Sequence, residues 1–121
     1  MSLFQKKLGV NGENIAAAYL KKQGYRVLQR NYRKKCGEID IIACDNDELV
    51  FIEVKTRSSA EYGSPFSAVN SRKQKQVIKT AETYLAETDN FDTAARFDVI
   101  AIIVEQGAEP QIDHIVGAFE L

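Results

Sequence analysis

The sequence predicts an α/β fold in which a central mixed sheet is flanked by helices, with the element order α-β-β-β-α-β-β. Two segments carry apolar residues at helical spacing, one after Asn11 and one after Ser71. Five other segments are rich in β-forming residues and are separated by turn formers. The chain has 121 residues, 45% of them hydrophobic, which suffices for one core, so residues 1–121 are expected to form a single domain.

The first helix is expected to begin at Asn11, a residue type that caps helix N-termini, and to end at Gly24, which tolerates the left-handed conformation that often follows a helix. Tyr25–Tyr32 follows as a strand, and the basic run Arg33-Lys34-Lys35 ends it. The helical stripe that would be buried consists of Ile15, Ala16, Tyr19 and Leu20.

Two neighbouring strands are expected to form a hairpin at the centre of the sheet. Glu38–Cys44 and Leu49–Thr56 alternate charged and apolar residues over part of their length, and Asp45-Asn46-Asp47 between them is typical of a turn. A loop is expected from Arg57 to about Val69. After the loop come a helix over Ser71–Glu87, with Val77, Ile78, Ala81, Tyr84 and Leu85 on its buried stripe, and strands over Asp98–Val104 and Ile112–Phe119.

Composition excludes several classes of protein. Two cysteines with no CxxC pair make neither a disulfide framework nor a zinc site, and both are expected to be reduced thiols. Neither a GxGxxG nor a GxxxxGKS/T nucleotide loop occurs. No apolar run reaches the roughly 18 residues of a membrane span, and the N-terminus lacks an apolar signal-peptide region. A cytoplasmic protein with no membrane partner is therefore expected.

Charge is distributed unevenly along the chain. Residues 1–79 contain 15 of the 16 basic and 8 of the 17 acidic residues, which leaves them at +7, whereas residues 80–121 carry −8. Such asymmetry indicates a surface for nucleic acid or another polyanion, although segregation of charges onto solvated faces would produce the same counts.

Acidic residues lie on the two central strands, where covered positions should be apolar. A buried carboxylate without a partner costs several kcal/mol, roughly, and two carboxylates also repel each other. Lys55 supplies one positive charge against at least two negative ones. Alternation along each strand puts Asp40 on a face with Glu38 and Ile42, opposite Ile39, Ile41 and Ala43, and puts Glu53 and Lys55 on a face with Phe51.

A divalent cation would compensate these carboxylates, because oxygen ligands suit Mg²⁺ or Mn²⁺. Lys55 beside such a metal would orient a water molecule or stabilise negative charge on a phosphate. The alternative is an edge strand whose charged face meets solvent, with Glu53 and Lys55 in ordinary cross-strand pairs.

Two blocks of the sequence, Gly37–Ala43 and Val50–Arg57, read GEIDIIA and VFIEVKTR. Together they resemble the PD-(D/E)XK nuclease signature, with Glu-Ile rather than Pro before the strand aspartate Asp40. The whole chain is similar to the YraN family of small bacterial proteins, from Gly12-Glu13 to Arg96-Phe97-Asp98. Its layout is also similar to that of archaeal Holliday-junction resolvases.

This resemblance implies a restriction-endonuclease-like core that hydrolyses phosphodiester bonds with Mg²⁺ or Mn²⁺. It implies that Asp40 and Glu53 are metal ligands, that Lys55 is the catalytic lysine beside them, and that Glu13 completes the metal site. Glu13 also has a simpler interpretation, because a carboxylate in a first helical turn is favoured by the helix dipole whatever else it does.

The implied partner is nucleic acid, with DNA favoured over RNA and branched or structured DNA among the substrates that fit. Since Holliday-junction enzymes act as symmetric dimers, the resemblance also raises a homodimer as an expectation. The alternative to an enzyme is a non-catalytic nucleic-acid-binding module of the same fold.

The second helix adds an observation of its own. Its first turn carries Arg72, Lys73 and Lys75, where the helix dipole favours acids. A phosphate would reverse that penalty, because free N–H groups and cations together bind anions. Nuclease relatives place a Gln or Lys on this helix, which makes Lys73 and Gln76 candidates, and Arg57 would extend the phosphate track. The alternative is a helix start that is simply exposed to water.

Two late residues are interpreted as structural. Asp98 resembles a family position, but Arg96 two residues earlier is also placed to form a local ion pair with it. His114, which is the single histidine and lies on a late strand, is expected to serve the fold and not the chemistry.

Overall fold

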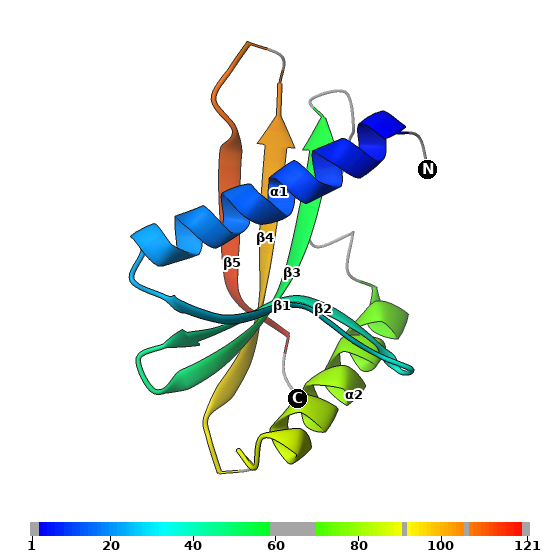
Figure 1. Cartoon of the computed structure of the whole chain (residues 1–121), viewed down its shortest axis with the longest axis vertical. Coiled ribbons are helices and arrows are strands. Elements are labelled where there is room, and N and C mark those ends of the chain that lie inside the picture. The colour runs from blue at the N-terminus through cyan, green and yellow to red at the C-terminus, as the bar shows by residue number, and fades with distance from the viewer. Residues whose placement is uncertain (1–2, 59–69, 91, 106, 120–121) are drawn as a thin grey trace.

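Five strands form one sheet, and a helix packs on each of its faces (Figure 1). The computed structural model describes residues 3–58, 70–90, 92–105 and 107–119, so most of the loop predicted from Arg57 to Val69 lies outside the described residues. The predicted order α-β-β-β-α-β-β is confirmed. The elements are α1 (Leu3–Lys22), β1 (Arg26–Lys34), β2 (Gly37–Asp45), β3 (Glu48–Ser58), α2 (Ser71–Glu87), β4 (Ala95–Val104) and β5 (Gln111–Phe119).

The sheet is mixed, as predicted, and its strands lie side by side in sequence order. Neighbouring strands are antiparallel except for β3 and β4, which are parallel. A parallel pair needs a crossover connection, and α2 lies on that connection. β2 and β3 form the predicted hairpin, whose turn passes through Asn46 with a φ of 55°, a conformation that Asn tolerates.

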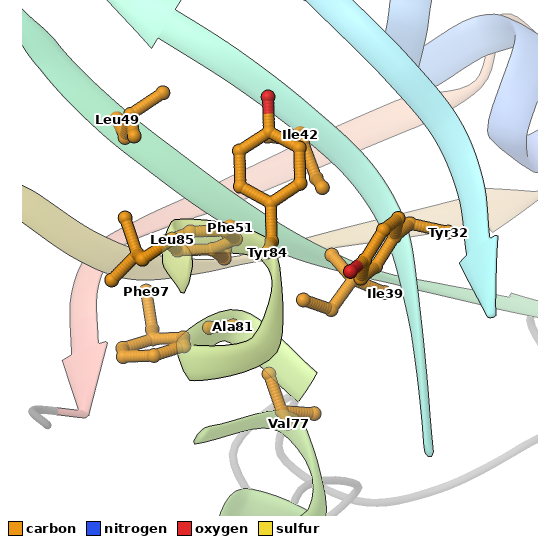
Figure 2. Packing of buried hydrophobic residues seen from close by; sticks show 10 residues of the cluster. All are labelled: Tyr32, Ile39, Ile42, Leu49, Phe51, Val77, Ala81, Tyr84, Leu85 and Phe97. Atoms are coloured by element: carbon orange, nitrogen blue, oxygen red, sulfur yellow. The ribbon is translucent and has the colours of Figure 1, made fainter. Parts of the chain in front are cut away.

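Apolar side chains make one core on each face of the sheet. On the α2 side, the Phe51 ring lies 5.8 Å from the Tyr84 ring and 5.5 Å from the Phe97 ring, measured between centroids (Figure 2). β2 and β3 contribute to both cores, so both central strands are covered on both faces. The α2-side core comprises Tyr32, Ile39, Ile42, Leu49, Phe51, Val77, Ala81, Tyr84, Leu85 and Phe97, and the α1-side core comprises Ala16, Ala17, Leu20, Ile41, Ala43, Val50, Ile52, Ile100 and Ile102.

The second helix occupies the predicted residues. Asn70 caps it, because its side-chain oxygen accepts a hydrogen bond from the Lys73 backbone N–H at 2.9 Å. Ile78 is only partly buried, and Thr80 is fully buried in the neighbouring turn. Thr80 tolerates that position because its hydroxyl donates to the Gln76 carbonyl at 2.7 Å.

The first helix begins earlier than predicted, at Leu3, so Asn11 lies inside it and is not its N-cap. Gly12 marks a close approach instead of a helix start. A Cβ at Gly12 would collide with Thr56 Oγ1 and lie 3.0 Å from Thr56 Cβ on β3, so only glycine lets α1 cross the sheet this closely. The predicted end is confirmed, because Gly24 follows the helix with a φ of 92°. Neither described helix combines the length and apolarity that crossing a membrane requires.

β2 does not alternate strictly along its whole length. Ile39 packs in the α2-side core together with Ile42, whereas Ile41 and Ala43 belong to the α1-side core. The prediction that Ile39 shares a face with Ile41 is therefore wrong. The register of β1 and β2 puts Asn31, with a left-handed φ of 53°, opposite Asp40. A left-handed residue in a paired strand reorients the local ladder, and Asp40 lies at this irregularity.

Candidate metal centre and nucleic-acid interface

Asp40 and Glu53 come together across the β2–β3 hairpin. The registered pair nearest to them is Ile41 with Ile52, and one further step along both strands puts Asp40 opposite Glu53. The Val54 backbone N–H donates to Asp40 Oδ2 at 2.8 Å, which holds the aspartate side chain over β3. Glu53 is 6% exposed and is therefore a buried acid. The predicted convergence of these two carboxyl groups is present in the structure.

Burial and repulsion both raise the pKa of one member of this pair, Asp40. Loss of solvation, followed by the charge of Glu53, raises the pKa of Asp40 to about 7, against the opposing hydrogen bond from Val54. The two carboxyl groups also share a hydrogen bond, and Glu38 adds a smaller repulsion. Near neutral pH the pair is thus poised to hold a proton or to accept a cation in its place.

Glu13 approaches the pair from α1. Because the helix begins at Leu3, Glu13 lies in the middle of α1, and the interpretation based on the helix dipole fails. Burial, and after it the charge of Asp40, raises the pKa of Glu13. Its Oε1 atom is buried and has no hydrogen-bond partner among the described residues, although Arg30 lies 3.7 Å away. A buried carboxylate oxygen without a hydrogen bond, close to the charges of Asp40 and Glu38, is the kind of atom that a cation satisfies.

The donor set suits a hard divalent cation such as Mg²⁺ or Mn²⁺, which prefers carboxylate oxygens. Asp40 and Glu53 would hold it, and Glu13 would add the third carboxylate. Within the described ranges, no three His, Cys, Asp or Glu side chains already lie in a common coordination arrangement. The structure therefore contains an adjoining carboxylate pair with Glu13 as its neighbour.

Two lysines lie beside the pair. Lys55 follows Glu53 by two residues on β3, so its side chain leaves the same face of the sheet, and it is half-buried. Lys73 reaches the site from the first turn of α2, with its Nζ atom 3.4 Å from Glu53 Oε1. The α2 start and the acidic pair, predicted separately from the sequence, are parts of one site.

The other predicted nucleic-acid contacts lie further out. Arg72, Lys75 and Gln76 are exposed and line a shallow open groove between α2 and the β1–β2 turn, which Cys36, Lys79 and Glu82 also border. Arg57 lies near the end of β3, two residues beyond Lys55.

Part of the basic run after β1 is occupied by partners within the chain. Arg33 Nε lies 3.1 Å from Glu38 Oε2, and Lys34 Nζ lies 2.8 Å from Glu87 Oε1. These two cations are paired at the tip of the β1–β2 hairpin. Lys35, the third residue of the run, lies in the turn and is exposed.

A second polar constellation lies on the α1 side of β4. Asp98 is 0% exposed and binds Arg96, as predicted for a local ion pair, with Arg96 Nε 3.1 Å from its Oδ1. It also lies 2.7 Å from His114 Nε2 and accepts from the Gly117 N–H at 3.0 Å. Tyr19 extends the chain of contacts, with its hydroxyl 3.0 Å from His114 Nδ1.

This Asp98 network was missed as a unit in the sequence. Although burial raises the pKa of Asp98, hydrogen bonds from His114 and Arg96 outweigh it and hold that pKa below its ordinary value. The signal was a single aspartate in the apolar run from Phe97 to Val104, which indicates a buried and paired charge. Apart from Arg96, its partners come from β5, and Tyr19 of α1 joins the network through His114, so spacing along the chain does not identify them.

Substitution of Asp40 with asparagine is expected to stabilise the metal-free protein in a pH-dependent way. Since the folded-state pKa of Asp40 is raised above its unfolded value, the stability that its protonated form contributes is complete below about pH 4 and is lost as the pH rises through about 7. Asparagine does not ionise. The gain in Tm over wild type should grow from near zero at pH 4 to roughly 5 °C or more at pH 8.

Thermal melts in EDTA between pH 4 and 8 measure this difference. Asp113→Asn, at an exposed position on β5, is the matched control and should leave Tm within about 1 °C at every pH. An Asp40→Asn gain of the same size at pH 4 and pH 8 would show that repulsion within the pair is not its source.

Fold and site together define a class of protein: an α/β domain whose central strands carry an adjoining carboxylate pair with two lysines beside it. A sequence profile described as uncharacterised protein family UPF0102 matches residues 12–102, and the chain belongs to this family, which is the predicted YraN family. The UPF0102 protein of Geobacter metallireducens is 52% identical over 100% of this chain and 98% of the relative. The UPF0102 proteins of Geobacter sulfurreducens and Chlorobium phaeobacteroides are 51% and 48% identical, covering 96% and 99% of this chain and 91% and 98% of those relatives.

Proposed function

We propose that the chain is a Mg²⁺- or Mn²⁺-dependent endonuclease that hydrolyses phosphodiester bonds in DNA. The observation that carries this proposal is the Asp40–Glu53 pair, two adjoining acids on covered central strands with Lys55 on the same face as Glu53. Acids repel phosphates, so a module that only binds nucleic acid gains nothing from placing the buried Glu53 and the half-buried Asp40 beside a cationic helix start.

The chemistry divides between the cation and the side chains. When bound, the cation would polarise a phosphate oxygen and lower the pKa of a water molecule. In hydrolysis the water oxygen bonds to phosphorus and the bond from phosphorus to one ester oxygen breaks. One product then carries a phosphate and the other a hydroxyl, which takes up a proton from solvent. Lys55 would orient the water and balance the charge that develops on the phosphate.

The cationic side chains outside the pair would hold the backbone of the nucleic acid. Arg72 and Lys75 are exposed along the groove beside the neutral amide of Gln76, and Lys73 in the same part of α2 contacts Glu53. Phosphate contacts of this kind position the strand without reading its sequence. The basic balance of residues 1–79 supports the same assignment.

The test is a panel of labelled duplex, nicked, branched and single-stranded DNA and of RNA, incubated with Mg²⁺, Mn²⁺ or EDTA. Wild type should cleave at least one DNA substrate with a metal and none in EDTA, and Glu53→Gln should cleave at least about 100-fold more slowly. Glu109→Gln removes an exposed carboxylate far from the pair in sequence and should retain the wild-type rate.

Two results would overturn the proposal. Tight nucleic-acid binding with no cleavage of any substrate under any metal condition would establish the binding-module alternative. Equal cleavage by wild type and Glu53→Gln would assign the activity to another site or to a contaminating nuclease.

A further inference from the structure

The two side chains in the Lys73–Glu53 contact differ in their conformational freedom. The Glu53 carboxylate is 6% exposed and belongs to a covered strand, so it moves little. The Lys73 side chain is 35% exposed and carries its ammonium group on a flexible four-carbon stem. The Asn70 cap anchors the Lys73 backbone at 2.9 Å. The ammonium group can therefore leave the carboxylate without any change in the helix.

A cation bound at the pair would meet this ammonium group directly. The Nζ atom lies 3.4 Å from Glu53 Oε1, an oxygen of one of the two carboxylates that would hold the cation. Two positive charges held at one carboxylate repel strongly at such separations. Lys73 and a divalent cation are therefore competitors for Glu53.

We propose that Lys73 is the resident counter-ion of Glu53, that a divalent cation displaces its ammonium group, and that the displaced group then binds a phosphate of the nucleic acid. The inference rests on the proposed function and adds to it a coupling between the metal and the substrate. Since coupling between two ligands is reciprocal, metal should tighten nucleic-acid binding and nucleic acid should tighten metal binding.

Arg72 and Lys75 differ from Lys73, and this difference assigns the coupling between metal and nucleic acid to Lys73. Both are exposed on the groove side of α2 and lie outside the ion pair with Glu53. Phosphates can reach them whether or not the pair holds a metal. Lys73 alone among these helix residues is in contact with the acidic pair, so the metal-dependent part of nucleic-acid binding should depend on it.

Mn²⁺ titration by calorimetry at pH 8 and low salt is the first measurement, on wild type, Lys73→Gln and Lys22→Gln. The Lys73→Gln variant lacks the competing charge and should bind Mn²⁺ about two- to fivefold more tightly than wild type, as expected for a half-exposed ion pair. Lys22→Gln removes an exposed charge at the end of α1 and should bind Mn²⁺ as wild type does.

The second measurement is fluorescence anisotropy of labelled DNA with Ca²⁺ or with EDTA. Ca²⁺ is expected to tighten binding of DNA to wild type, and this enhancement should shrink by at least half in Lys73→Gln but not in Lys22→Gln. Circular dichroism of each variant checks that α2 is retained.

The outcomes separate this inference from the proposed function. Equal Mn²⁺ affinity of wild type and Lys73→Gln, or an equal gain in Lys22→Gln, would overturn the role of Lys73 while the metal site stands. Absence of Mn²⁺ binding in wild type and in both variants would overturn the metal site together with the inference.

Discussion

Replacement of Lys55 with alanine is expected to lower the rate of phosphodiester hydrolysis by at least about 100-fold, the usual size of a lost proton-transfer or charge-stabilising group. Lys55 lies two residues from Glu53 on the same face of β3, about 7 Å away along the backbone. At this distance its ammonium group can reach a phosphate or a water molecule held at the carboxylate pair. DNA affinity should stay within a few-fold, because one lysine is a small part of a contact to several phosphates.

Single-turnover cleavage with Mn²⁺ measures the rate of hydrolysis, and fluorescence anisotropy with Ca²⁺ measures the affinity for DNA. Lys21→Ala is the matched control, since it removes an exposed lysine near the end of α1 and should leave both unchanged. A Lys55→Ala variant that cleaves at the wild-type rate contradicts the role of this lysine. A variant that loses binding as much as cleavage would make Lys55 a binding residue and not a catalytic one.

Replacement of Asp98 with alanine is expected to give the largest loss of stability among single substitutions of a charged residue. The carboxylate is 0% exposed and has Arg96, His114 and the Gly117 N–H as partners. Removing one partner of a buried ion pair leaves the other polar groups unsatisfied and costs about 3–5 kcal/mol. Arg96 keeps Asp45 and Glu48, at 3.1 and 2.7 Å, so the loss should lie near the lower end of that range.

Urea unfolding monitored by circular dichroism gives the change in the free energy of unfolding, and Tm should fall by roughly 10 °C. Asp113→Ala on the neighbouring strand β5 is exposed and should change the free energy of unfolding by less than about 0.5 kcal/mol. A loss below about 1 kcal/mol for Asp98→Ala would mean that solvent or rearranged side chains replace its contacts. Since Asp98 and its partners Arg96, His114 and Gly117 are not members of the candidate metal site, the folded variant should still bind Mn²⁺.

Local sequence patterns were sufficient to predict most of the architecture. Alternation and turn residues predicted the β2–β3 hairpin, and the apolar stripe with a preceding Asn predicted α2 from Ser71 to Glu87. These features depend on residues a few positions apart, so they can be predicted from the amino-acid sequence alone. The pairing of Asp40 with Glu53 was also accessible, because hairpin register follows from the turn that connects the two strands.

The sequence by itself therefore determined the element order, the mixed sheet, the family and the two acids of the central hairpin. The tertiary structure alone decided that α1 starts before Asn11, that Ile39 turns to the α2-side core, and that Asp98 gathers partners from β5. It also brought Lys73 to Glu53. The contacts of Asp98 and Lys73 join residues 15 or more positions apart, and the orientation of Ile39 depends on a backbone irregularity. Such contacts are selected by packing and burial of the whole chain, and no periodicity within one segment encodes them.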